Sequence, residues 1–183
     1  MAIYHYHRGI GKRSKGKNAV FAAAYIRGEE RTCLITQENK DFSNRLDVVY
    51  TDCILPDDAP AWAINLRHSK IKNEGGQYVY DISGRNFSDY VWNQIEIIEK
   101  RSDAQLYFHD DIAIPQELGP EAAIELVRDF VKESLAVDGV FCDIAIHWEA
   151  GNPHAHVMLP LRQMTETGFS NKVRFTRASL SNE

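Results

Sequence analysis

The sequence predicts an α+β protein with a central antiparallel β-sheet and helices packed on its faces. Strand-like and helix-like segments alternate along most of the chain, and the last two strands are joined by a short turn. Parallel neighbours need a crossover of a dozen or more residues, so this turn favours antiparallel pairing. At 183 residues with 44% hydrophobic content, the chain fits a single domain with its own core.

The expected elements follow from the spacing of apolar residues along the chain. Residues that alternate in character predict strands, and apolar residues three or four apart predict helices. The stretch over residues 67–89 fits neither pattern well, so we expect a surface hairpin insertion there. In order, we expect strands over 2–8, 45–55 and 106–114, helices over 19–27, 89–100 and 120–135, a basic loop over 9–17, and a final hairpin over 142–159.

Two of the helices carry recognisable boundary residues. Asn18 can cap the alanine-rich helix over 19–27, and Gly28 is a suitable residue to end it. Pro120 stands in the first turn of the later helix, where its missing N–H costs nothing. Tyr25 lies near the end of the first helix, and this segment alone favours a packed aromatic residue there.

Three histidines in the final hairpin are candidate metal ligands. Alternation places His154 and His156 on one face of their strand, and antiparallel pairing across the turn at residues 149–153 brings His147 to the same face. Neighbours on such a face lie about 4.5–7 Å apart, so three imidazoles can converge on one ion. A solvated polar strand face is the alternative interpretation. The third histidine at matching parity favours the metal site.

The charge distribution points to a local anionic partner. The chain has a net charge of −5, yet its first 31 residues hold seven Lys and Arg against two Glu. A basic segment on an acidic body favours contact with a phosphate backbone over general coating of nucleic acid. The candidate phosphate-binding residues are Arg8, Lys12, Arg13, Lys15, Lys17 and Arg27.

The remaining composition bounds the class of protein. No run of apolar residues is long enough to span a bilayer, and the polar N-terminus lacks the apolar core of a signal peptide. Three cysteines form neither an even disulfide set nor a Cys-x-x-Cys pair. We therefore expect a cytoplasmic protein with reduced cysteines.

Five segments resemble the MobA/MobL (MobQ-type) plasmid conjugative relaxases, which belong to the HUH endonuclease superfamily. The match keeps the order of the family, and the set is far more specific than any one segment. The segments are Met1-Ala-Ile-Tyr-His5, Arg13-Ser-Lys-Gly16, Asn18-Ala-Val-Phe-Ala-Ala-Ala-Tyr25-Ile-Arg-Gly28, Ile112-Ala-Ile-Pro-Gln-Glu-Leu118 and Ile146-His147 with Asn152-Pro-His154-Ala-His156.

The resemblance implies a metal-dependent enzyme that nicks and reseals single-stranded DNA at a plasmid transfer origin for conjugation. It implies Tyr25 as the nucleophile that forms a 5′-phosphotyrosyl intermediate, and His147, His154 and His156 as ligands of a divalent metal. Manganese or magnesium is the expected ion, and imidazoles also suit zinc and nickel. Accessory relaxosome proteins and a secretion-system coupling protein would be further partners.

The resemblance also implies an acidic helper, which aligns best with Asp111. His109 lies on the same strand face two residues earlier, so either residue could orient a ligand or accept the tyrosine proton. A strand-end carboxylate that simply faces solvent is the plainer interpretation. Relaxases of this family usually continue into further domains, so we expect residues 1–183 to be a single relaxase domain from the N-terminal part of a longer protein.

Three other functions stay open at this stage. A rolling-circle replication initiator of the same superfamily would use the same histidines, but such proteins place their tyrosine after the histidines. A non-catalytic, metal-containing DNA-binding module would keep Tyr25 as packed core. A hydrolase that uses metal-activated water would cut DNA without the tyrosine.

Overall fold

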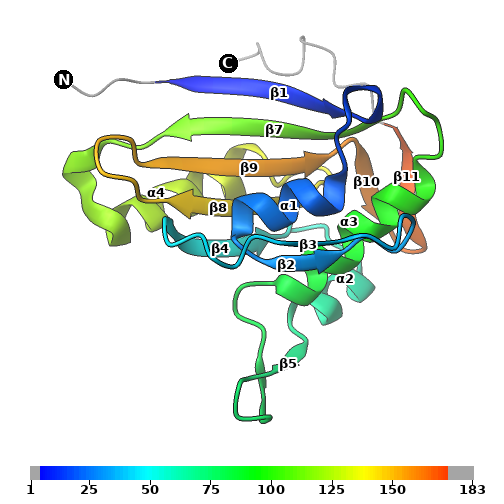
Figure 1. Cartoon of the computed structure of the whole chain (residues 1–183), viewed down its shortest axis with the longest axis horizontal. Helices are drawn as coiled ribbons and strands as arrows, with labels where there is room; N and C mark the ends of the chain where they lie inside the picture. Colours follow the sequence, from blue (N-terminus) through cyan, green and yellow to red (C-terminus); the bar gives the residue numbers. More distant parts are fainter. Residues whose placement is uncertain (1–4, 173–183) are drawn as a thin grey trace.

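A five-stranded antiparallel sheet forms the centre of the protein, which a computed structural model describes over residues 5–172. Every neighbouring pair in the sheet is antiparallel (Figure 1). Strands that are far apart in the sequence lie side by side: residues 6–12 pair with residues 105–112. The order across the sheet is β1 (Tyr6–Lys12), β7 (Gln105–Ala113), β9 (His154–Pro160), β8 (Cys142–His147) and β4 (Val48–Ile54).

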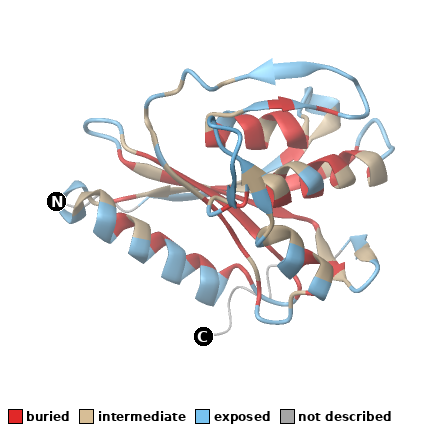
Figure 2. Ribbon diagram, turned by 90° about the horizontal axis from the view of Figure 1, so that it is seen from below, coloured by how far each residue is buried: buried red, intermediate tan, exposed pale blue. Residues whose placement is uncertain are grey.

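Helices cover both faces of this sheet. Three helices, α1 (Ala19–Arg27), α2 (Ala61–Arg67) and α3 (Arg85–Ile98), pack on one face in a core that includes Ala145 and Met158. The long helix α4 (Gly119–Ser134) packs on the other face. Figure 2 shows the buried strands between these two layers, with the exposed side of each helix facing outward. The predicted fold class is therefore confirmed.

Within residues 5–172, three small hairpins and two short 3₁₀ helices lie outside the central sheet. The hairpin of β5 and β6 projects away from the sheet (Figure 1), at the position where the irregular stretch predicted an insertion. The remaining bounds are β2 (Glu30–Thr32) with β3 (Asn39–Asp41), β5 (Lys70–Lys72) with β6 (Tyr78–Tyr80), β10 (Arg162–Thr165) with β11 (Gly168–Lys172), η1 (Arg13–Lys15) and η2 (Gln116–Leu118).

Capping residues and apolar spacing in the sequence predicted most helix and strand boundaries to within a few residues of those observed. Asn18 caps α1 by accepting a hydrogen bond from the N–H of Phe21, and Gly28 ends the helix in a left-handed conformation. Two expectations were wrong. Residues 9–12 belong to β1 and not to a loop, and α3 begins at Arg85, four residues earlier than expected. The expected strand start at residue 2 lies outside the described residues.

The first strand continues through its glycines, and a large aromatic ring covers one of them. A side chain at Gly11 would meet the ring of Tyr107, which pairs with Gly11 across the sheet, at 2.3 Å. The glycine thus gives room for a buried aromatic ring and is not a sign of a loop. Within the described residues, no helix has the length and apolar character needed to cross a membrane.

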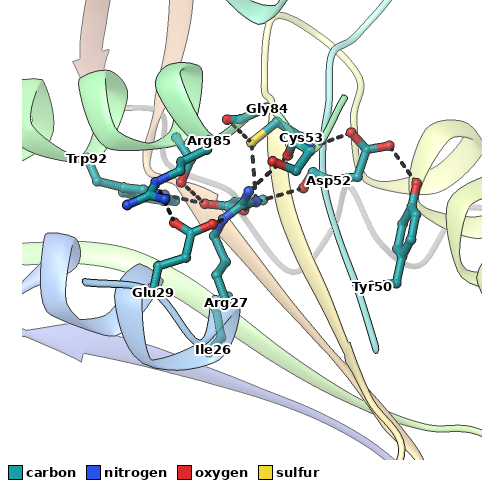
Figure 3. A network of polar contacts seen from close by, with 12 residues as sticks. Ile26, Arg27, Glu29, Tyr50, Asp52, Cys53, Gly84, Arg85 and Trp92 are labelled. Carbon is teal, nitrogen blue, oxygen red and sulfur yellow. Dashed lines mark hydrogen bonds and ion pairs between the residues drawn. The ribbon is translucent and has the colours of Figure 1, made fainter. Parts of the chain in front are cut away.

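A buried polar network joins α1 to the sheet (Figure 3). Arg27 donates to the carboxylate of Asp143 on β8 at 2.7 Å, and both side chains are fully buried. Trp92 on α3 donates to the other carboxylate oxygen at 2.8 Å, and the hydroxyl of Ser88 donates to that same oxygen. Unpairing either buried charge is costly, so this network fixes the position of α1 over β8.

Candidate metal and nucleophile site

The predicted histidine cluster forms in the register that the hairpin required. His147 pairs directly with His154 across β8 and β9, and His156 pairs with Asp111 across β9 and β7. The ring centroids of His147, His154 and His156 lie 4.5 to 5.1 Å apart. One nitrogen from each ring lies within 4.8 Å of the other two. This spacing suits a single ion held by three imidazoles.

Each of the three imidazoles has an oxygen acceptor at a ring nitrogen, and the second nitrogen of His147, Nδ1, also lies 3.3 Å from Asp47 Oδ2. His147 Nε2 lies 2.6 Å from the carbonyl of Ile26, and His154 Nδ1 lies 2.8 Å from the carbonyl of Asn152. His156 Nδ1 lies 2.6 Å from Asp111 Oδ1. Metal-bound histidines commonly donate their second N–H to such oxygens, which fixes the tautomer and the ring orientation. The donor set therefore fits a divalent ion.

Burial keeps two of these rings neutral. Desolvation lowers the pKa of His147 below its usual value. Desolvation and the neighbouring rings of His109 and His147 lower the pKa of His156 to about 3. A neutral imidazole has the free lone pair that a metal requires.

Tyr25 lies at the exposed surface next to this cluster, with 49% of its area accessible. It sits on the last turn of α1, and the following residue, Ile26, provides the carbonyl that His147 contacts. The ring of Phe42 approaches Tyr25 edge-on, with centroids 5.5 Å apart. The packed-core interpretation of Tyr25 is therefore wrong, because the ring faces solvent beside the histidines.

Asp111 and His109 both contact the Nδ1 atom of His156. Asp111 Oδ1 is 2.6 Å from His156 Nδ1, and His109 Nε2 is 3.0 Å from the same nitrogen. His109, Asp111 and His156 form a second cluster of ligand-type atoms. Burial lowers the pKa of His109, so this ring also tends to be neutral. Asp111 is therefore placed to hold the His156 ring in its orientation.

The six predicted phosphate-binding residues divide into two groups. Lys15 and Lys17 are exposed and Lys12 is half-buried, beside the start of α1. Arg27 is buried and paired with Asp143, so the expectation that it contacts phosphate is wrong. Arg8 forms two hydrogen bonds with buried Asp110, and Arg13 pairs with buried Glu96. Those two arginines are engaged within the fold.

Arg45 is a residue of the site that the sequence did not single out. It lies between β3 and β4, and its guanidinium carbon is 4.4 Å from the centre of the Tyr25 ring. Its Nη2 atom is 3.2 Å from His147 Nδ1. The spacing of Arg45 and Asp47, two residues apart, predicts an ion pair between them. No pattern in the neighbouring sequence predicts that this pair lies beside Tyr25.

An open cavity of about 540 Å³ adjoins the histidines. Asp111, His154 and His156 form one side of it, and the segment that follows β7 forms another. The cavity therefore borders two of the three candidate ligands. Its lining also includes His5, Pro115, Gln116, Glu117, Asn152 and Pro153.

Comparison with known proteins adds relatives that share most of this chain. The conjugal transfer protein TraA of Agrobacterium fabrum is 37% identical over 172 residues, which cover 94% of this chain and 14% of TraA. The mobilization protein MobL of Acidithiobacillus ferridurans is 30% identical over 80% of this chain and 32% of its own length. The chain therefore spans only a small part of these relatives.

A solved structure has the same architecture. It was determined in work on the molecular basis of vancomycin resistance transfer in Staphylococcus aureus, and it superposes with a TM-score of 0.76 at 25% sequence identity. The match covers 96% of this chain and 79% of that chain. The α+β HUH relaxase architecture is thereby confirmed. The MobA/MobL family matches residues 17–182, so this chain belongs to the MobA/MobL family of plasmid mobilization relaxases.

Proposed function

We propose that this domain nicks single-stranded DNA at a transfer origin by attack of Tyr25, holds the cut strand as a 5′-phosphotyrosyl ester, and reseals it. The observation that carries the proposal is an exposed tyrosine joined through Ile26 and Arg45 to a cluster of three convergent imidazoles, on a chain of the MobA/MobL family. Relatives named for conjugal transfer and mobilization support the same role.

The reaction exchanges one phosphoester bond for another. The phenolic oxygen of Tyr25 bonds to phosphorus as the bond from phosphorus to the 3′ oxygen breaks. The phenol loses its proton to a base or water, and the departing 3′ oxygen takes one up. Because the phosphodiester energy is kept in the tyrosyl ester, a free 3′-OH can later attack that ester and restore the strand.

The histidines would bind a divalent ion, with manganese or magnesium the expected metal. Such an ion supplies Lewis-acid polarisation of the scissile phosphate and stabilises charge in the transition state. Asp111 keeps the His156 ring oriented toward the ion-binding face, and Ile26 does the same for His147 through its main-chain oxygen. Both contacts hold the ligand set in place before substrate arrives.

DNA binding would use three lysines near α1, of which Lys15 and Lys17 are exposed and Lys12 is half-buried. Lys12, Lys15 and Lys17 surround the turn that leads into the tyrosine helix, so they can hold the backbone beside the nucleophile. Arg8, Arg13 and Arg27 have no part in this proposal, because each is paired with an acidic residue.

A denaturing gel tests the proposal directly. The domain is incubated with a labelled, random-sequence pool of single-stranded DNA, with Mn²⁺ or with EDTA, and covalent protein–DNA product is measured. Tyr25→Phe is compared with Tyr90→Phe, a matched control because Tyr90 is similarly exposed, at 45%, on α3. We expect Mn²⁺-dependent adduct with the wild type and Tyr90→Phe, and none with Tyr25→Phe.

Other outcomes would contradict the proposal in different ways. Adduct that persists in Tyr25→Phe would mean that another residue is the nucleophile. Cleaved DNA without any adduct would indicate metal-activated water. No cleaved DNA with any divalent metal would favour a binding module.

A further inference from the structure

Arg45 connects the candidate nucleophile to the candidate metal ligands. Its guanidinium lies over the Tyr25 ring, 4.4 Å from the centroid, and one of its nitrogens lies 3.2 Å from His147 Nδ1. A second nitrogen faces the carbonyl of Tyr25 at 3.4 Å. No other arginine in residues 5–172 has contacts with both Tyr25 and a histidine of the cluster among the described interactions.

The Tyr25 ring is held on two sides. Phe42 contacts it edge-on, and Arg45 covers its face. The N–H of Arg45 donates to the carbonyl of Phe42 at 3.2 Å, so both contacts come from one tight turn. That turn packs closely against Gly28, where an added side chain would meet Val48 at 3.2 Å and Arg45 at 3.5 Å. The fold therefore builds this enclosure around an exposed tyrosine.

Asp47 fixes the Arg45 guanidinium through Nε and Nη2, which leaves the Nη1 atom outside this ion pair. Arg45 Nε donates to Asp47 Oδ1 at 3.1 Å, and Nη2 donates to Asp47 Oδ2. The N–H of Trp148 in turn donates to the carbonyl of Asp47 at 2.8 Å, which ties this segment to the end of β8. A guanidinium has five N–H donors, so its Nη1 edge keeps a donor available for an anion.

We propose that Arg45 is a catalytic residue of strand transfer: it holds the Tyr25 ring in its attacking position and donates to a non-bridging oxygen of the scissile phosphate. The inference rests on the proposed function, because it assumes that Tyr25 is the nucleophile. Arg45 is 17% exposed at its side chain, so it is fixed by the fold and still open to substrate.

The chemistry of the step suits a planar cation at this place. Attack by the phenol, loss of its proton and departure of the 3′ oxygen leave the non-bridging oxygens with more negative charge in the transition state than in the ground state. A fixed donor aimed at those oxygens lowers the barrier more than it strengthens binding. Lysine has the charge but lacks the flat face that stacks on tyrosine and the forked donors.

The test measures adduct formation under single-turnover conditions, with an oligonucleotide recovered from the wild-type adduct as the probe. The variants are Arg45→Gln and Arg45→Lys. Arg101→Gln is the matched control, because Arg101 forms the same Arg-x-Asp pair with Asp103, at 2.9 and 2.8 Å, on an exposed surface. Binding of the same DNA is measured separately with EDTA present.

We expect Arg45→Gln to slow adduct formation about 100-fold, as loss of one fixed transition-state donor does elsewhere. Arg45→Lys should recover part of that rate, and Arg101→Gln should match the wild type. The dissociation constant for DNA should change less than about tenfold, which is the effect of a single contact worth about 1.4 kcal/mol. Melting curves establish that each variant is folded.

A second probe separates phosphate contact from a structural role. A methylphosphonate replaces one non-bridging oxygen of the scissile phosphate with a methyl group, in either stereoisomer. If Arg45 contacts that oxygen, one stereoisomer slows the wild type strongly and slows Arg45→Gln much less, because the lost contact is the same. A merely structural arginine would leave both stereoisomer effects unchanged.

The outcomes distinguish this inference from the proposed function. Wild-type adduct with an unchanged rate in Arg45→Gln would overturn the role of Arg45 and leave Tyr25 as nucleophile. Additive effects of Arg45→Gln and both methylphosphonates would overturn the phosphate contact. Absence of adduct in the wild type would instead remove the proposed function itself.

Discussion

His147 Nε2 lies 2.6 Å from the main-chain oxygen of Ile26, the residue that follows Tyr25. One hydrogen bond thus links a candidate metal ligand on β8 to the helix turn that carries the candidate nucleophile. The buried pair of Arg27, the next residue of α1, and Asp143 joins the same two elements. The fold therefore sets the position of the helix turn that carries Tyr25 relative to His147, before any substrate binds.

Removal of the carboxylate at Asp111 should weaken metal binding. Asp111→Ala removes the acceptor that orients His156, and loss of such partners typically costs about 10- to 100-fold in metal affinity. Asp111→Asn keeps an oxygen acceptor and should lose less. Titration calorimetry with Mn²⁺ measures the affinities, and Asp103→Ala, at an exposed carboxylate, is the control. Equal affinity in Asp111→Ala and the control would show that His156 needs no such partner.

Asp143→Asn should destabilise the fold at neutral pH by about 3–5 kcal/mol, since it leaves the buried charge of Arg27 without its partner. Urea unfolding at pH 7 gives the free energy of unfolding. Asp103→Asn changes an exposed carboxylate and should leave it unchanged. A wild-type value for Asp143→Asn would mean that the network does not hold α1 in place.

The same substitution should change the acid sensitivity of the fold. Although burial raises it, the charges of Arg27 and Arg31 hold the pKa of Asp143 below its ordinary value. Such a carboxyl stabilises the fold above its unfolded pKa of about 3.9, and this contribution is lost as pH falls through the lower, folded pKa. The melting temperatures of wild type and Asp143→Asn should therefore converge below about pH 4. A constant difference down to low pH would contradict the assignment.

The exposed lysines near α1 should determine the salt dependence of DNA binding. Each phosphate contact to single strands contributes about −0.7 to the slope of log affinity against log salt. Lys15→Gln with Lys17→Gln should therefore reduce the slope by about 1.4. The control is Arg128→Gln with Lys132→Gln, which removes equal charge from α4 on the opposite face of the sheet. Equal slopes for the two double variants would contradict a local DNA path beside α1.

Local patterns in the sequence were sufficient for the hairpin and its histidines. Strict alternation along both arms fixed which side chains share a face, and the short turn fixed the antiparallel pairing. The cap at Asn18 and the stop at Gly28 likewise depend on neighbouring residues alone. These features were predicted because each one is decided within a few residues of itself.

The features that could not be predicted from the sequence depend on contacts between residues far apart in the chain. Arg8 and Arg27 look like surface cations in a basic segment, yet their partners Asp110 and Asp143 stand more than 100 residues away. Arg45 reaches Tyr25 only because the turn that follows β3 folds back over α1. Such contacts depend on the order of strands in the sheet, which no local pattern specifies.

Mass spectrometry of the covalent product tests the central claim most directly. Trypsin releases the peptide over residues 18–27, in which Tyr25 is the one hydroxyl-bearing residue. After nuclease trimming of the adduct, we predict the added nucleotide mass on this peptide, with fragmentation placing it on Tyr25. Nucleotide mass on a different peptide, such as residues 1–8 with Tyr4 and Tyr6, would contradict the account.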